Sequence, residues 1–371
     1  MASGENPTRS LTLWLELICH DHGVNFHGGE QGCACGAMGS GKSTLCLKIA
    51  QEACYCPECN KKDLIEYALD TEKTRAKNVY VKPETVIYRA REYDHWTALL
   101  PENWRRSFPD RVARPKPLDV YVHVDDDFTF GYKDGNRVHA IPHLPPVRRY
   151  RNAYDLIQQM EEGHINVVYE PTNYTLNEFM YQVLEKKRMS KMERKKDTPI
   201  KSSVFWYELI HTLLKDKPHE YYTLAIDEFH DIAEMNPQQD MWHLQDVLAK
   251  AFLSLRKQNI SLIASTHDHE LIDYRITHRF GFWIWLIGSM PRASVSQVWP
   301  TSIPKLRIGK GWIEKKQSEF WKLEYGKIKH QPPIVHCLDV KDEKVKLEEY
   351  HEKPTDFDII RVEELRGRLE V

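Results

Sequence analysis

Residues 36–43 read Gly36-Ala37-Met38-Gly39-Ser40-Gly41-Lys42-Ser43, a glycine and four residues before Gly-Lys-Ser. The glycines let the backbone fold so that successive N–H groups point inward, where they bind phosphate oxygens. Residues 32–35 are typical of a short buried strand, and the apolar spacing over 44–54 predicts a helix. A helix N-terminus adds partial positive charge. This stretch therefore predicts a strand–loop–helix unit that binds a nucleoside triphosphate.

The positions of this loop, a Walker A motif, have expected roles. Lys42 reaches the β- and γ-phosphates, and the hydroxyl of Ser43 ligates Mg²⁺. ATP and Mg²⁺ are therefore the expected ligands. We expect the nucleotide to be bound by Gly36, Ala37, Met38, Gly39, Ser40, Gly41, Lys42, Ser43 and Thr44.

An acidic pair follows a second apolar run. Residues 222–226 predict a buried strand, and Asp227-Glu228 comes directly after it. Ligands bind at the carboxyl ends of the strands in parallel sheets. Asp227 is expected to hold Mg²⁺ or its water, and Glu228 to orient the attacking water as the catalytic residue. Alone, this pattern also fits a strand that runs into a polar turn, but with the upstream loop it indicates a Walker B motif and an ATPase.

A third apolar run, over 260–264, also ends in polar side chains. Thr266 and His267 follow it, and they are candidates for a catalytic group that senses the γ-phosphate. The alternative is an ordinary strand end.

Strand-like and helix-like segments alternate along the chain, which predicts an α/β fold with a mainly parallel sheet flanked by helices. Together with the loop, this indicates a P-loop NTPase of the ASCE or RecA-like type. Lys42 and Asp227 are 185 residues apart (227 − 42), so an insertion is expected between Walker A and Walker B. The expected division is an arm plus the loop and first helix over 1–60, an insertion with a possible α+β subdomain over 61–150, the rest of the core over 151–330, and a charged extension over 331–371.

The order of these motifs resembles the FtsK/HerA superfamily of P-loop ATPases, over residues 30–60 and 165–290. The segment Leu271-Ile272-Asp273-Tyr274-Arg275-Ile276 fits a pattern that follows the sensor strand in that superfamily. His267 stands where the superfamily commonly has glutamine. The superfamily comprises DNA translocases, viral genome-packaging ATPases, conjugation ATPases and Zot-like phage proteins.

The resemblance implies an ATP-hydrolysing motor that translocates DNA or packages a viral or plasmid genome. It implies a homo-oligomeric ring, often a hexamer, with DNA and a capsid or portal protein as partners. A neighbouring subunit would supply an arginine finger; the candidates are Arg256, Arg275, Arg279 and Arg292. The alternatives are a Zot-like phage-assembly ATPase, a small-molecule kinase with the same loop, and a binding-only switch.

Charge and membrane signals narrow the class further. The net charge is −2, which argues against a wholly basic nucleic-acid coat protein. Residues 186–201 nevertheless carry eight Lys or Arg, which suit either a phosphate backbone or a solvated loop. No apolar run is long enough for a membrane span and no signal peptide is evident, so we expect a cytoplasmic protein.

The cysteines form two groups. Cys33, Cys35 and Cys46 flank the loop, and we expect them to be small buried apolar residues. The second group, Cys54, Cys56 and Cys59, contains a Cys-x-x-Cys pair that could form half of a Zn²⁺ site. The alternative is a set of reduced thiols at a helix end.

Overall fold

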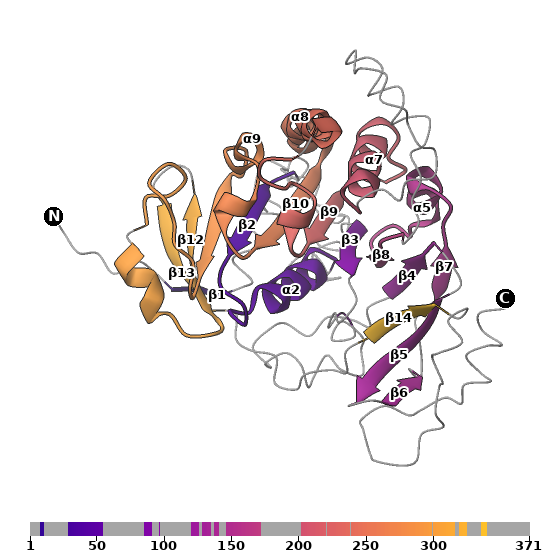
Figure 1. Cartoon of the computed structure of the whole chain (residues 1–371), viewed down its shortest axis with the longest axis horizontal. Coiled ribbons are helices and arrows are strands. Elements are labelled where there is room, and N and C mark those ends of the chain that lie inside the picture. Colours follow the sequence, from indigo (N-terminus) through magenta and orange to yellow (C-terminus); the bar gives the residue numbers. More distant parts are fainter. Residues whose placement is uncertain are drawn as a thin grey trace, which may run out of the picture.

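The computed structural model describes residues 8–10, 29–54, 85–90, 96, 120–125, 128–134, 137–140, 146–171, 202–219, 221–237, 239–298, 300–315, 319–324 and 335–339. Within these ranges, eleven strands form one large sheet (Figure 1). In spatial order they are β1 (Thr8–Ser10), β13 (Glu319–Glu324), β12 (Lys310–Lys315), β11 (Phe282–Leu286), β2 (Gln31–Cys35), β10 (Ile260–Thr266), β9 (Tyr222–Ile226), β3 (Thr85–Ala90), β8 (Ile165–Tyr169), β4 (Val120–Val124) and β7 (Val147–Arg149).

The central strands run parallel, as the alternating pattern predicts. Strand β2 pairs with β11 and β10, β10 with β9, β9 with β3, and β3 with β8, all in parallel register. Strand β10 therefore lies between the strand that precedes the glycine-rich loop and the strand that precedes Asp227. In this order the carboxyl ends of β2, β10, β9 and β3 share one edge of the sheet.

Helices cover both faces of this sheet (Figure 1). They are α2 (Lys42–Cys54), α5 (Ala153–Gln159), α7 (Ser202–Lys215), α8 (Gln239–Leu255) and α9 (Tyr274–Thr277), with 3-10 turns η3 (Phe229–Asp231), η4 (Arg256–Gln258), η5 (His269–Leu271) and η6 (Pro300–Lys305).

Alternation along the strands separates the two faces. Cys33, Cys35 and Leu224 belong to one apolar core with α5, α7 and α8. The intervening Ala34 and Ala225 therefore face the opposite side. Helix α2 packs against β9, β10 and β3, and it covers that opposite side. The strands are buried on both faces, which is why most of their residues are apolar.

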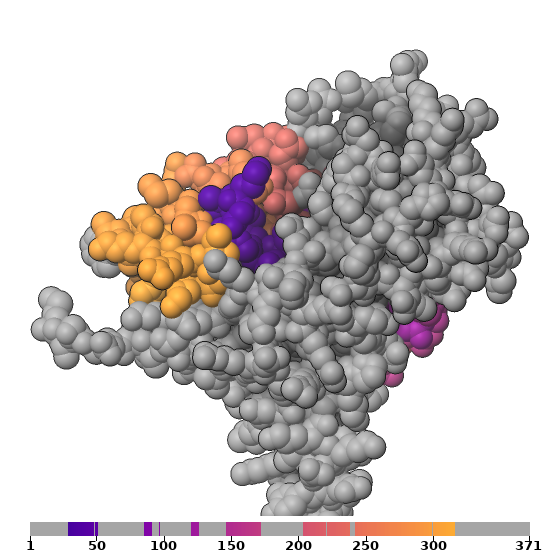
Figure 2. All heavy atoms as spheres, turned by 90° about the horizontal axis from the view of Figure 1, so that it is seen from below, coloured from indigo at the N-terminus to yellow at the C-terminus, as the bar shows by residue number. Residues whose placement is uncertain are grey.

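Antiparallel additions lie outside the parallel region. Strands β12 and β13 form an antiparallel hairpin next to β11, and β1 pairs in parallel with β13. A second sheet contains β14 (Val335–Asp339), β5 (Phe128–Asp134) and β6 (Arg137–Ala140), all antiparallel. In Figure 2, atoms of the indigo segment that begins at residue 29 reach the surface beside orange atoms from the C-terminal half of the chain.

The segment expected to be an insertion, 61–150, contributes to both sheets. Strands β3, β4 and β7 belong to the large sheet, whereas β5 and β6 belong to the small one. The sequence analysis did not predict β3, because Arg89 interrupts its apolar pattern. Arg89 is nevertheless buried there. The four-part division of the chain stays a prediction.

Three cysteines near the loop have the environment expected from the sequence. Cys33, Cys35 and Cys46 are buried free thiols. Burial raises the pKa of Cys35 to about 12, so this thiol stays protonated and uncharged at neutral pH.

Two sequence predictions lie beyond what the structure describes. Residues 186–201, with the basic run, fall outside the described ranges, and so do Cys56 and Cys59; Cys54 ends α2, but its side chain is not described. Of the described helices, none combines the length and apolar character that crossing a bilayer requires.

A buried histidine in β4 makes stability depend on pH. The ring of His123 is fully buried, with Nε2 2.9 Å from Asn166 Oδ1, and burial lowers its pKa to about 4. An unfolded histidine titrates near 6.5, so the unfolded chain binds more protons between those two pH values. The contribution is complete above about pH 6.5 and is lost as pH falls towards 4.

We therefore expect the free energy of unfolding to decrease by about 2–3 kcal/mol between pH 7.5 and 4.5 through this residue. Urea denaturation of wild type and His123→Gln at both pH values measures it. The glutamine variant should show a pH dependence weaker by that amount; an identical dependence in the two proteins would contradict the assignment.

Candidate active site

The glycine-rich loop is tightly enclosed at its first position and open at its tip. A Cβ on Gly36 would lie 2.5 Å from Ser40 Oγ and 2.8 Å from Leu286 Cβ. Gly39 and Gly41 have φ of 73° and 97°, a region that favours glycine. Met38, which precedes Gly39, is 87% exposed. The N–H groups of the first turn of α2 have no intrahelical acceptors, so they are available to an anion.

Lys42 is held inside this loop although it carries a charge. Its side chain is buried, and Nζ lies 2.9 Å from Gly36 O, 3.1 Å from Ala37 O and 3.0 Å from His267 Nδ1. An ammonium has three donors and no acceptor. In this network His267 Nδ1 is therefore an acceptor without a proton, and the proton of the neutral ring is assigned to Nε2.

The first helix and the acidic strand meet at two oxygen-bearing side chains. Ser43 Oγ donates to Asp227 Oδ2 over 2.6 Å, and Ser265 Oγ donates to Asp227 Oδ1. Oxygen donors of this kind suit Mg²⁺. Ser43 and Asp227, the two residues that the sequence predicts as metal ligands, are therefore in direct contact and could share one ion.

Glu228 is held at the same edge. His267 Nε2 lies 3.1 Å from Glu228 Oε1, so His267 connects the carboxylate of Glu228 to the ammonium of Lys42. Glu228 Oε2 is buried, has no hydrogen-bond partner among the described residues, and lies 3.4 Å from His230 Nδ1. A buried carboxylate oxygen without a partner can accept a hydrogen bond from a water molecule.

The backbone of Glu228 adopts an uncommon conformation. Its φ and ψ are 49° and 53°, in the left-handed helical region. For a residue with a Cβ this conformation costs roughly 1–2 kcal/mol. Such strain persists where the surroundings hold it, and it is often found at functional sites.

A buried arginine contacts the backbone of this turn, and it was not among the residues predicted from the sequence. Arg89 NH1 donates to Asp227 O and Glu228 O, each over 3.0 Å. Its Nε pairs with Glu170 Oε1, the oxygen that also accepts from Trp206 Nε1 over 2.7 Å. The signal was present, because an arginine in an apolar strand needs buried acceptors.

The two residues predicted to sense the γ-phosphate point in different directions. His267 contacts both Lys42 and Glu228. Thr266 is buried, and its Oγ1 donates to Asp268 O over 2.8 Å and lies 3.3 Å from His230 Nδ1. The geometry thus places His267, and not Thr266, between the ammonium of Lys42 and the carboxylate of Glu228. The sensor role stays a prediction for both.

The four candidate finger arginines lie on the stretch 256–292. Arg275 forms a bidentate pair with Asp273, at 2.6 Å for NH2–Oδ2 and 3.0 Å for Nε–Oδ1. Arg256 NH2 is 3.1 Å from Glu30 Oε1, Arg292 pairs with Glu270, and Arg279 is exposed. None of these pairs includes Asp227 or Glu228. Which arginine completes a neighbour's site stays a prediction.

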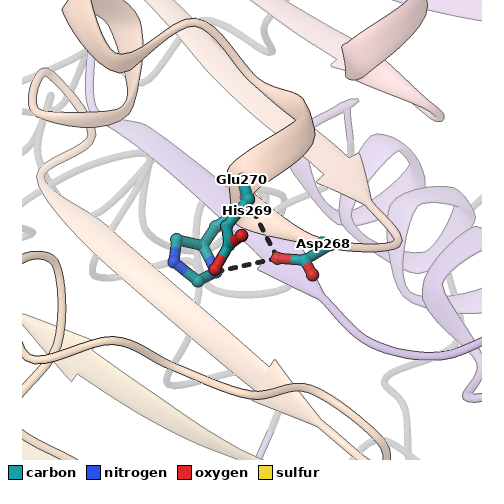
Figure 3. Close-up of side chains that lie close together, drawn as sticks. All are labelled: Asp268, His269 and Glu270. Atoms are coloured by element: carbon teal, nitrogen blue, oxygen red, sulfur yellow. Dashed lines mark hydrogen bonds and ion pairs between the residues drawn. The ribbon is translucent and has the colours of Figure 1, made fainter. Parts of the chain in front are cut away.

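Three consecutive residues after β10 form a group with metal-ligand chemistry (Figure 3). Asp268, His269 and Glu270 each offer one ligand atom, and these atoms lie within 4.8 Å of one another. Both carboxylates already have partners, because Asp268 Oδ1 accepts from the N–H of Glu270, and Glu270 pairs with Arg292. Asp268 therefore serves as the N-cap of η5 and Glu270 as the partner of Arg292, so neither carboxylate needs a metal ion to explain its position. The side chains of Cys54, Cys56 and Cys59 lie outside the described residues, so the possible Zn²⁺ site there stays a prediction without support.

Strand order and site geometry decide the fold class. The glycine-rich loop joins β2 to α2, the acidic pair follows β9, and β10 separates the two strands. The chain has a P-loop NTPase fold.

Several solved structures are similar to this chain. No protein-family model and no curated protein matches the sequence. Similar solved structures include the genome-packaging NTPase B204 of Sulfolobus turreted icosahedral virus 2 in complex with ATP-gammaS, at 11% identity and a TM-score of 0.35, over 81% of this chain and 98% of that one. The N-terminal domain of zonular occludens toxin from Neisseria meningitidis matches at 12% and 0.25, over 85% and 96%.

A third similar structure is the pCW3 conjugation coupling protein TcpA, at 10% identity and a TM-score of 0.34, over 88% of this chain and 70% of that one. The fold assignment itself rests on the strand order and the loop geometry of this chain.

Enclosure of Gly36 gives a test of the nucleotide site. Gly36→Ala places a methyl group against Ser40 and Leu286, and overpacking of this kind costs about 1–3 kcal/mol. We expect the affinity for ATP to decrease about tenfold or more, measured by calorimetry. The matched control is Gly281→Ala at the other end of β11, where the nearest atom, Glu30 Oε2, is 3.3 Å away and can move. Equal affinities in the two variants would contradict the site.

Proposed function

We propose that this chain is an ATP-hydrolysing motor that translocates or packages DNA as an oligomeric ring. The observation that carries the ATPase part is the contact of Lys42, His267 and Glu228 at the edge where Ser43 meets Asp227. Lys42 and Ser43 come from helix α2, which follows β2, and the other three groups come from the carboxyl ends of β9 and β10. Their chemistry is that of a site for hydrolysis of a phosphoanhydride bond.

Each residue has a step that its position suits. N–H groups of the glycine-rich loop and of the first turn of α2 bind the phosphates, and Lys42 leaves the loop carbonyls to pair with the β- and γ-phosphate oxygens. Ser43 and Asp227 hold Mg²⁺, which neutralises charge on the phosphates when bound. Glu228 accepts a hydrogen bond from water on its free Oε2 and directs that water at the γ-phosphorus.

His267 has a distinct part in this scheme. When Lys42 turns to the phosphates, His267 Nδ1 loses its ammonium partner. The ring can then move, and this movement changes its contact between Nε2 and the carboxylate of Glu228. A group that senses the γ-phosphate is expected to change its contacts when the phosphate binds. His267 does so by losing the hydrogen bond that its Nδ1 accepts from Lys42.

The DNA part of the proposal is supported by the motif order along the chain. The segment Leu271–Ile276, which follows the sensor strand, continues the resemblance to FtsK/HerA motors. The eight basic residues in 186–201 supply the charge that a phosphate backbone needs. In a ring this charge is repeated around one channel, so a near-neutral subunit can still bind DNA. A capsid or portal protein belongs to the packaging version of this proposal.

Two variants separate nucleotide binding from hydrolysis. Lys42→Ala removes the ammonium that pairs with the phosphates, so binding and turnover of ATP should both be lost. Glu228→Gln keeps the size of the side chain but removes the base; it should bind ATP within about threefold of wild type and turn over at least about 100-fold more slowly. Equilibrium binding and phosphate release measure the two effects.

The matched control is Glu161→Gln, an exposed carboxylate that pairs with Arg148 at the far edge of the sheet. It should retain wild-type turnover. Wild-type turnover in Lys42→Ala would disprove the nucleotide site, and wild-type turnover in Glu228→Gln would assign the base to another residue.

Duplex DNA separates a motor from the alternatives. We expect ATP turnover to rise with duplex length and this stimulation to weaken as salt increases, since released counterions contribute to the binding of phosphates. Turnover is measured without DNA, with single strands and with duplexes of several lengths, alongside the mass of the assembled particle. A small-molecule kinase would respond to an acceptor instead. Equal rates with and without duplex at low salt would remove the DNA part and leave the ATPase.

A further inference from the structure

Arg89 is a charged residue buried inside the sheet. It lies on β3, which pairs with β9 on one side and β8 on the other, and its side chain is 2% exposed. Tyr88 pairs with Ala225, so Arg89 lies beside the last residue of β9 and reaches the turn that follows it. A buried guanidinium needs acceptors for its N–H donors.

Two of these acceptors belong to the backbone of the acidic pair. Arg89 NH1 lies 3.0 Å from Asp227 O and 3.0 Å from Glu228 O. The first carbonyl belongs to the peptide plane before the Cα of Glu228, and the second to the plane after it. Because φ and ψ are rotations of those two planes about one Cα, a single nitrogen that holds both carbonyls restrains both angles.

The restrained angles are the unusual ones. Glu228 has φ 49° and ψ 53°, a conformation that a residue with a Cβ seldom adopts unless its surroundings impose it. That conformation sets the direction of Cβ, and with it places the carboxylate 3.1 Å from His267 Nε2. A turn that relaxed to ordinary angles would aim the carboxylate elsewhere.

The opposite side of the guanidinium is also held. Arg89 Nε pairs with Glu170 Oε1 at the end of β8, and Trp206 Nε1 of α7 donates to the same oxygen over 2.7 Å. Arg89 NH2 lies 3.5 Å from Asp231 Oδ2 in η3. Carboxylates therefore balance its charge, and Glu170 fixes the plane of the guanidinium, which aims NH1 at the two carbonyls.

We propose that Arg89, held by Glu170, is a positioning residue that keeps Glu228 in the left-handed conformation needed to direct the attacking water. It acts through backbone carbonyls and does not touch the nucleotide. This inference rests on the proposed hydrolysis by Glu228. It differs from an arginine finger, which would come from a neighbouring subunit and act on the transferring phosphoryl.

The first test is Arg89→Lys, which keeps the charge but loses the planar fork that reaches two carbonyls and a carboxylate at once. We expect kcat to decrease about 10- to 100-fold, since misplacing a catalytic group by about 1 Å has effects of that size. The affinity for a non-hydrolysable ATP analogue should stay within about threefold of wild type. The matched control is Arg148→Lys, an arginine that also pairs with one carbonyl and one carboxylate, but on edge strand β7.

A double-mutant cycle separates positioning from general structural support. In the Glu228→Gln background, Arg89→Lys should lower kcat by less than about threefold further, because there is no base left to misplace. A similar loss in both backgrounds would overturn the proposal, as would an unchanged kcat or an equal loss in Arg148→Lys. If Arg89→Lys does not fold, Glu170→Gln supplies the same comparison; it replaces the charged acceptor of Nε by a weaker neutral one, so the guanidinium is held less firmly and kcat should decrease with ATP affinity intact.

The same experiment distinguishes this inference from the proposed function. Wild-type protein without ATP turnover would overturn both. Turnover that depends on Glu228 but not on Arg89 or Glu170 would overturn the positioning role alone.

Discussion

The hydrogen bond from Ser43 to Asp227 joins residues 184 positions apart, and the site depends on it. It connects the first helix to the end of β9, across the intervening strand β10. Such a contact is possible because the three strands run parallel, which brings their carboxyl ends to one edge. Once that edge is formed, the loop, the acidic pair and the polar end of β10 are necessarily neighbours.

Charge at this edge is balanced by exchangeable contacts. Lys42 has its three donors on two loop carbonyls and one imidazole nitrogen, and His267 passes the connection on to Glu228. Lys42 thus forms none of these three hydrogen bonds with a carboxylate. A lysine held in this way can transfer to phosphate oxygens without breaking a buried ion pair, which would be far more costly. The network is thus suited to a residue that changes partners in each catalytic cycle.

Strain and its support come from different segments. Glu228 is in a left-handed conformation, and Arg89 on the adjacent strand holds the carbonyls on both sides of it. Glu170 and Trp206, from two further elements, hold the arginine. Four segments of the chain therefore cooperate to orient one carboxylate, and the cost of its backbone conformation is offset by buried hydrogen bonds that only the folded chain provides.

Much of the parallel core could be predicted because its signals are local. Apolar runs predicted the positions of β2, β9 and β10, and the glycine spacing predicted the loop. Strand β3 was missed, since Arg89 breaks the apolar pattern by which buried strands are recognised. The hairpin of β12 and β13 was missed as well, because charged residues such as Glu314 and Lys322 limit its apolar stretches to a few residues.

The sequence by itself determined which residues can bind phosphate, ligate Mg²⁺ and activate water, because those capacities belong to side-chain chemistry and to glycine spacing. Tertiary structure decided how they are arranged. It brought His267 rather than Thr266 between Lys42 and Glu228, and it placed Arg89 against the turn of Glu228. The reason is physical: side-chain direction at a strand end and contacts between distant segments depend on register and backbone angles, which no local pattern of residues encodes.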